Sequence, residues 1–172
     1  KPNATTAASY SVAGNFKGRV DDPRLPQPLT SVSLPFQLTQ SELRVQDAEA
    51  WAGETRLQMS GSVKGSMTDG LSAASPFSMR LKVEDIELND QLAKPLTGKF
   101  RDAWDKFSPQ GKIDADVTVL FDGHEMKTSV VADLLDASIA YYKFPYRLHH
   151  AQGQVRFHEN TLEVDHVSAT AS

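Results

Sequence analysis

An alternation of apolar and polar residues with a period of two recurs along this chain and constrains its fold more than any other feature. It is clearest in residues 10–20, 55–64, 77–84 and 152–157. Because successive side chains of a strand point to opposite faces of a sheet, the pattern predicts strands with one apolar and one polar face. Strands of this kind are typical of antiparallel sheets, which can keep one face dry and the other in water.

The segment 112–133 predicts the clearest hairpin. Its centre, Asp122-Gly123, favours a two-residue turn of type I′ between two alternating strands. A loop of that length places Phe121 opposite His124 and brings the apolar residues of both strands onto one face. The polar residues of the hairpin are then expected on the opposite face of the sheet.

The alternation stops between residues 89 and 108, where large apolar residues recur at spacings of three and four. That spacing is typical of a helix with one apolar stripe, so the segment predicts one amphipathic helix around residues 90–107, inserted between strands. Pro95 and Gly98 favour an irregular start or a start near Pro95. The residues expected to dock the helix on the sheet are Leu96, Phe100, Trp104 and Phe107.

The predicted strands share one apolar side, and one helix is too little to cover it. The rest of that side has to be covered by a second sheet, by the curl of the sheet itself or by a ligand. The residues expected to line it are Tyr10, Val12, Phe16, Val20, Leu57, Met59, Val63, Phe77, Met79, Leu81, Val83, Ile113, Val117, Val119, Met126, Val130, Val155 and Phe157.

Composition and motifs argue against several functional classes. With 18 Lys and Arg against 22 Asp and Glu, the net charge of −4 offers no basic surface for nucleic acid. Cysteine is absent, which removes disulfides and cysteine-ligated zinc. The sequence has no nucleophile motif, phosphate-binding glycine loop or metal-ligand spacing. We therefore expect neither an enzyme nor a cofactor or metal site.

Two groups of residues invite a chemical role, and each has a simpler interpretation. Asp114 and Asp116 share a face, as paired catalytic carboxylates do, but alternation places both on the polar face in water. His149 and His150 are adjacent in a predicted strand, so they point to opposite faces and cannot bind one metal ion together.

Two stretches of the chain match each other. Residues 34–38 and 144–148 both read as an apolar residue, Pro, an aromatic residue, any residue and Leu. The same alignment matches Ser41 with Ala151, and in both copies an alternating strand follows. We expect each copy to fold as a strand, a bend and a second strand. The proline in each copy is compatible with this fold, since proline is tolerated near the start of a strand.

The match divides the chain into repeat units of roughly 31–65 and 141–172, with a helical insertion at 89–108. Repeated strand units predict an elongated sheet that grows by addition. Because the chain begins at Lys1 and its last residues still alternate, we expect residues 1–172 to be a single segment of a larger repeating protein.

Three stretches resemble one family of envelope proteins. Residues 144–172 and 34–65 look like the strand repeats of the AsmA-like family, the bacterial relatives of TamB and of the chorein-type bridge-like lipid transfer proteins. Residues 95–119 resemble the helix and outgoing strand of large AsmA-like proteins. The resemblance implies a long, curled antiparallel sheet, open along one side, whose apolar groove conducts phospholipids between two membranes.

On this resemblance the expected function is a non-enzymatic, lipid-binding or lipid-conducting segment that serves phospholipid transport or outer-membrane biogenesis. The expected partners are a phospholipid or another acyl-chain lipid and neighbouring segments of the same protein. The expected location is the periplasm or cell envelope, with attachment to the inner membrane through parts outside this chain. The alternative is a β-sandwich or β-solenoid module for adhesion or polysaccharide binding, whose apolar face is an ordinary closed core.

Overall fold

A computed structural model of the protein has nine strands and two short helices among the residues that it describes. The residues that the structure describes are 9–23, 25–65, 70, 72, 74–143, 146–158 and 161–171. In chain order the elements are β1 (Ser11–Val20), β2 (Leu29–Thr39), β3 (Glu42–Ala52), β4 (Thr55–Lys64), β5 (Phe77–Leu88), α1 (Asp90–Ala93), α2 (Gly98–Phe107), β6 (Gln110–Phe121), β7 (Met126–Ile139), β8 (Leu148–His158) and β9 (Thr161–Ala171).

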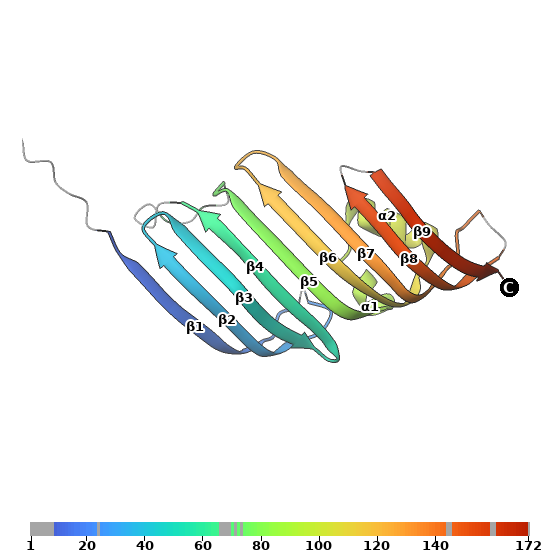
Figure 1. The fold of residues 1–172 in the computed structure, drawn as a ribbon, viewed down its shortest axis with the longest axis horizontal. Helices are drawn as coiled ribbons and strands as arrows, with labels where there is room; N and C mark the ends of the chain where they lie inside the picture. The colour runs from blue at the N-terminus through green and yellow to red at the C-terminus, as the bar shows by residue number, and fades with distance from the viewer. Residues whose placement is uncertain are drawn as a thin grey trace, which may run out of the picture.

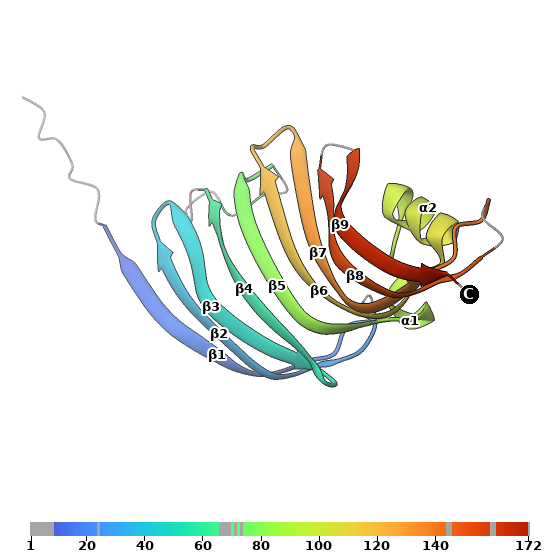
Figure 2. The same cartoon turned by 45° about the vertical axis from the view of Figure 1, so that its right-hand side comes forward.

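All nine strands form one open antiparallel sheet in which each strand pairs with its neighbours in the sequence. The predicted fold class is confirmed: the chain is mainly β, as the alternation indicates, and its antiparallel sheet is curled, as the resemblance implies (Figure 1). The strands bend in the same sense, and α2 lies on the concave side of the curled sheet, near β8 and β9 (Figure 2). A second sheet is not part of the described structure.

Five strands bend at a single extra residue with a positive φ angle. The register shifts in every strand pairing except that of β4 with β5. Such bulges bend a strand and increase its twist, which accounts for the curl of a sheet that has no covering layer in its described part. Asp and His tolerate the left-handed conformation better than most residues. The five residues are Ser31, Asp47, Asp85, His150 and His166.

The predicted single helix around residues 90–107 is divided into α1 and α2. Pro95 explains the break, because proline has no N–H to donate and its ring clashes with the carbonyl group four residues earlier. The chain closes α1 with a bond from the Lys94 N–H to the Gln91 carbonyl oxygen at 3.3 Å. It then restarts at Gly98, whose φ of +55° is readily adopted by glycine.

The β6–β7 hairpin forms, but its loop is longer than the predicted two residues. The loop runs over residues 122–125, and Phe121 is opposite Met126 instead of His124. The side chain of Asp122 accepts hydrogen bonds from the backbone N–H groups of His124 at 2.8 Å and Glu125 at 2.9 Å. These two bonds favour the longer turn. Because the register differs by two residues, the side chains of the two paired strands still lie on their predicted faces, whereas His124 lies in the turn.

The residue-by-residue match between the two predicted repeats is not a structural equivalence. Ser41 lies in the turn between β2 and β3, whereas Ala151 lies inside β8, which runs without a turn from Leu148 to His158. Phe144 and Pro145, the start of the second copy, lie outside the described residues. The repeated feature of the described structure is instead the strand with its bulge.

Small residues make up most of the buried core. Among the described residues, no large side chain is fully buried. Where the strands bend, the concave face has little room, and alanine fits there without crowding its neighbours. The buried hydrophobic residues are Val32, Ala48, Ala50, Ala52, Val83, Leu88, Ala93, Ala115, Ala137 and Ala151.

Candidate functional site: the concave apolar face

Strand register places the predicted lining residues on one face of the sheet. Partners directly opposite each other in neighbouring strands share a face. The rows that connect them run across many strands. Tyr10 is the exception among the predicted lining residues, since it lies just before β1. One row runs from β3 to β9 through Ala48, Met59, Leu81, Val117, Val130, Phe157 and Leu162.

The large side chains of this face remain partly exposed. Phe16 is 49 % exposed and Val12 is 50 % exposed near one edge, and Val164 is 62 % exposed in the strand at the other edge. Between them, Met59, Leu81 and Val117 are half-buried. In a sandwich core such side chains would be covered by the second sheet. The described part of the chain therefore presents an open apolar face.

Helix α2 covers only a small part of this face. The ring of Phe100 packs against Phe157 of β8 with 4.9 Å between the ring centroids. At the other end of α2, Phe107 stacks on Tyr141 at 5.3 Å, and the backbone N–H of Ala140 donates to the Phe107 carbonyl oxygen at 2.8 Å. No residue of α2 is buried. The helix is thus attached at both ends but packs loosely.

The four predicted docking residues have different positions. Phe100 and Phe107 make the ring contacts just described. Trp104 is half-buried in α2 and makes none of the described ring contacts. Leu96 is half-buried but precedes α2, because the helix begins only at Gly98. The predicted docking stripe is therefore not one continuous contact.

A cavity at one end of the concave face was missed by the sequence reasoning. It has a volume of about 560 Å³ and lies between the ends of β4 and β5, the loop that follows β1, and α1. In the sequence, residues 21–30 are rich in proline and show no alternation. Leu25 of this loop and Leu29 at the start of β2 were the available signal, since apolar residues outside the alternating pattern can pack against a neighbouring apolar surface.

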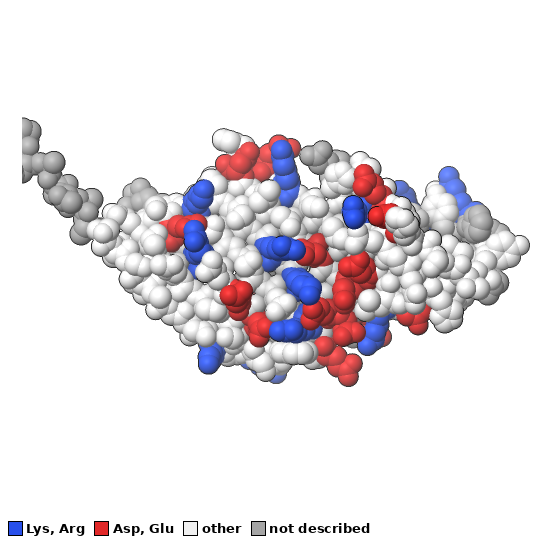
Figure 3. All heavy atoms as spheres, in the orientation of Figure 1, with Lys and Arg blue, Asp and Glu red and all other residues white. Residues whose placement is uncertain are grey.

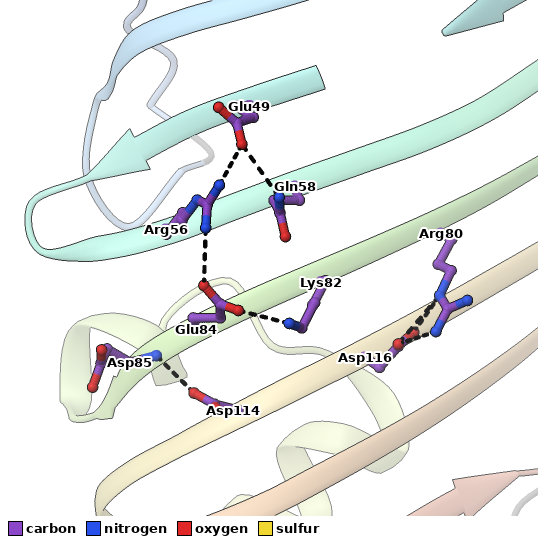
Figure 4. Close-up of polar contacts among 9 residues, drawn as sticks. All are labelled: Glu49, Arg56, Gln58, Arg80, Lys82, Glu84, Asp85, Asp114 and Asp116. Atoms are coloured by element: carbon purple, nitrogen blue, oxygen red, sulfur yellow. Dashed lines mark hydrogen bonds and ion pairs between the residues drawn. The ribbon is translucent and has the colours of Figure 1, made fainter. Parts of the chain in front are cut away.

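The opposite, convex face is polar and carries paired charges. Figure 3 shows basic and acidic side chains intermixed over the middle of the face that is turned away from α2. In the close-up of Figure 4, Arg56 of β4 bridges Glu49 of β3 at 2.5 Å and Glu84 of β5 at 3.6 Å. Glu84 also pairs with Lys82 at 2.6 Å. This chain of ion pairs links three strands on the water-facing side.

The ion pairs change the ionisation of their members in the direction that favours charge. The hydrogen bond from Arg56 holds the pKa of Glu49 below its usual value, with a further contribution from Gln58. The hydrogen bond from Lys82 lowers the pKa of Glu84 in the same way. Both carboxylates are at the surface, so these contacts fix strand register rather than prepare a group for proton transfer.

The residues considered for catalysis or metal binding have structural partners. Asp114 accepts a hydrogen bond from the Asp85 backbone N–H at 2.9 Å. Asp116 accepts a hydrogen bond from Arg80 at 3.0 Å. His150 pairs with Asp136 at 3.0 Å. In the described part of the chain, His, Asp and Glu form no group of three or more that could hold a metal ion.

Two further observations complete the description of this face. None of the helices in the described residues has the length and apolar character needed to cross a membrane. Comparison of the chain with family models, with curated proteins and with solved structures finds no match.

Proposed function

We propose that the concave face binds the acyl chains of phospholipids or similar lipids and lets them move along the sheet. In this proposal the chain is a non-enzymatic segment of an AsmA-like protein of the cell envelope. It would contribute to phospholipid transport between membranes or to outer-membrane biogenesis, together with neighbouring segments of the same protein. Membrane contact would be made by parts outside this chain.

The observation that carries the proposal is the open row of apolar side chains across neighbouring strands. Partly exposed apolar surface of this extent marks a binding surface in soluble proteins. An acyl chain of about fifteen methylenes gains on the order of 12 kcal/mol when it is completely buried. An open face removes water from only one side of the chain, so the gain is smaller. Weaker binding suits a surface that must also release its ligand.

The separation of charge supports recognition of hydrocarbon rather than of a headgroup. The ion pairs of Arg56 and Arg80 lie on the convex face. The rows of the concave face between β4 and β8 are built from apolar residues, alanine, glycine and threonine. Dispersion and burial are not directional, so an acyl chain can slide along such a face without breaking specific bonds.

The alternative of an adhesion or polysaccharide-binding module would need aromatic side chains on the water-facing side. Among the described strands, Trp51 of β3 is the one aromatic residue on the convex face, where it is 40 % exposed. A single ring gives no extended stacking surface for a sugar chain. We therefore keep the lipid proposal as the single candidate function.

A pair of neighbouring residues in β6 tests the proposal. Val119 is opposite Met79 on the concave face, and Thr118 is opposite Arg80 on the convex face. Both side chains are half-buried, and their backbone positions are adjacent. A photo-crosslinking amino acid at position 119 should capture lipid in cells, and the same amino acid at position 118 should not.

The control is folding, because either substitution could disturb the sheet. Both variants should keep the circular dichroism spectrum and melting temperature of the parent chain within a few degrees. Equal lipid capture at the two positions would contradict the assignment of faces. Lipid capture at neither position by two folded variants would contradict the proposed function.

A further inference from the structure

Hydrogen bonds hold the walls of the cavity at the α1 end of the concave face in place. Its floor is formed by Leu57 of β4 and by Leu81 and Val83 of β5. Leu25 of the loop after β1 and Leu92 of α1 line the cavity from the other side. Its volume of about 560 Å³ falls within the range of small-molecule pockets. It is therefore a partly enclosed site at one end of the concave face, and it shares Leu57, Leu81 and Val83 with that face.

Two contacts fix the loop and α1 in place. The Gln27 side chain donates a hydrogen bond to the Ala52 carbonyl oxygen at 2.7 Å, which ties the loop to the end of β3. The Asn89 side chain caps α1 by accepting bonds from the N–H groups of Gln91 at 3.0 Å and Leu92 at 3.1 Å. The loop thus lies against the end of the sheet instead of extending into water, and Leu92 is held beside the cavity.

Three of the four charged residues that line the cavity are acidic. Glu54, Asp85 and Glu87 are exposed and contribute three carboxylates. Lys112 contributes the one ammonium group, and it lies 3.8 Å from the Asp85 carboxylate. Among the described residues, no ion pair neutralises Glu54 or Glu87. The described residues that line the cavity therefore carry a net negative charge.

We propose that this cavity binds the hydrocarbon tail of an amphiphile whose polar end is uncharged or cationic, and that its acidic mouth disfavours anionic amphiphiles. The apolar floor accepts the tail, and the polar end remains at the mouth beside Glu54 and Glu87. The inference rests on the proposed function only in taking hydrocarbon as the ligand. The proposed cavity would select amphiphiles by charge, whereas the apolar rows of the concave face carry no charged residue for such selection.

Three amphiphiles with the same twelve-carbon tail test the charge selectivity. The neutral probe is dodecyl maltoside, the cation is dodecyltrimethylammonium and the anion is laurate, each titrated calorimetrically below its critical micelle concentration. A charge pair about 4 Å apart in water changes an affinity roughly fivefold. We expect the cation to bind at least as tightly as the neutral probe, and laurate to bind about five to twenty-five times more weakly than the neutral probe.

Paired variants separate the acidic mouth from the overall charge of the chain. The Glu54→Gln/Glu87→Gln double variant should bring the affinity for laurate close to that for dodecyl maltoside. The control, Asp102→Asn/Glu163→Gln, makes the same change in net charge at exposed positions outside the cavity lining and should keep the difference. Equal affinities for laurate and dodecyl maltoside in the parent chain would overturn the charge selectivity. So would a control variant that removes the difference as well as the mouth variant does.

Two further pairs test where the tail binds. Leu57→Trp fills the cavity, whereas Ser62→Trp adds the same ring to the same strand on the convex face, away from the cavity lining and from the apolar row. Leu92→Gln places a polar side chain in the cavity wall formed by α1. Leu96→Gln makes the same substitution at a residue that does not line the cavity. The second pair lies outside the sheet, so it remains informative if a tryptophan variant does not fold. We expect the affinity for dodecyl maltoside to fall at least tenfold in Leu57→Trp and Leu92→Gln, and to stay within twofold in their controls.

The outcomes distinguish this inference from the proposed function. If Leu57→Trp and Leu92→Gln bind dodecyl maltoside normally while a crosslinker at position 119 captures lipid, the cavity is not the site and the open face stands. If the cavity variants lose binding but position 119 captures no lipid, the cavity stands and the open-face proposal fails.

Discussion

The ring of Phe100 in α2 lies against the ring of Phe157 in β8, with 4.9 Å between the centroids and an angle of 55° between the planes. Phe157 belongs to the apolar row of the concave face, so this pair connects the helix to the proposed lipid-binding surface. Phe100 is nevertheless 38 % exposed, which indicates that the helix rests on the sheet without burying its stripe.

A double-mutant cycle should detect this contact. Aromatic pairs contribute about 0.5 to 1.5 kcal/mol beyond the area that they bury. Phe100→Ala and Phe157→Ala should therefore show a coupling of about 1 kcal/mol in the free energy of unfolding, measured by urea denaturation. As a control, Phe100→Ala and Phe121→Ala should be additive, because Phe121 packs with Phe77 instead. A coupling near zero for Phe100 with Phe157 would show that the ring contact contributes nothing.

Replacement of Trp104 by alanine should cost less than the loss of a core aromatic residue. A fully buried aromatic residue costs about 3 to 5 kcal/mol when it is truncated to alanine. Trp104 is half-buried, and α2 has no buried residue. We expect a loss of about 1 to 2 kcal/mol in the free energy of unfolding, roughly half the core value. A loss above about 3 kcal/mol would mean that the helix packs more tightly in solution than described here.

Two glycines of the concave face should respond differently to alanine. A Cβ atom on Gly61 of β4 would lie 2.5 Å from the Ser78 carbonyl oxygen and 3.2 Å from the Met79 Cα, both of which belong to the backbone of β5. A Cβ atom on Gly14 would meet only the ring of Phe36, at 2.7 Å. A ring can rotate, whereas two paired strands have to separate. Gly61→Ala should therefore cost about 2 kcal/mol or more, and Gly14→Ala clearly less, in urea denaturation.

The bulge at Asp47 should accept glycine and reject valine. Its φ of +52° is strained for a β-branched residue, whereas glycine adopts it freely. Asp47→Val should lower the free energy of unfolding by about 1 to 3 kcal/mol relative to Asp47→Gly. Val45→Thr, a change in the same strand at a position outside the bulge, serves as the comparison for altered β-propensity. Equal stability of the two Asp47 variants would show that the left-handed residue is not needed.

The ion pairs of the convex face should make stability depend on pH in one direction. The pKa of Glu49 in the folded state is lowered by the Arg56 hydrogen bond, so its contribution is complete above the unfolded-state pKa and is lost as the pH falls through the folded-state value. The difference in unfolding free energy between the parent chain and Glu49→Gln should therefore be largest at neutral pH and vanish in acid. Urea denaturation at a series of pH values measures it.

Salt provides the control for this pH dependence. Because Glu49 and Arg56 are exposed to solvent, 1 M NaCl should reduce the difference at neutral pH. Glu125→Gln removes a carboxylate that has no ion pair among the described residues, and it should leave stability nearly unchanged. A difference for Glu49→Gln that grows in acid would contradict the assigned direction.

The alternation of the sequence was sufficient to predict the strands and their faces. Val117 and Val119 lie on the concave face as predicted, even though the hairpin register differs from the prediction by two residues. The register depended on the Asp122 side chain, which bonds to two backbone N–H groups in the turn. A side-chain preference for turns is visible in a sequence, but the choice between turns of two and four residues depends on such bonds.

The features that could not be predicted depend on contacts between distant residues. The cavity needs the bond between Gln27 and Ala52, which are separated by 25 positions and follow no periodic pattern. The bulge at Asp85 interrupts the alternation of β5 by one residue. In the sequence, such an interruption looks the same as the end of a strand. Pro95 did indicate an irregular start of the predicted helix, but not its division into α1 and α2, nor that α2 would pack through so few side chains.

The bulges have a consequence for how such a sheet can diversify. Val45 and Ala48 of β3 are three positions apart, while their partners Gly61 and Met59 are two apart, so Asp47 is one residue more than the pairing needs. Deleting that residue would restore the regular spacing and leave Val45 and Ala48 on the concave face. The curvature of β3, and of the other strands with such a bulge, can therefore change by a single codon while the apolar surface is preserved. Among related proteins, insertion or deletion of a bulge residue can therefore change the width of the concave face without changing the residues that line it.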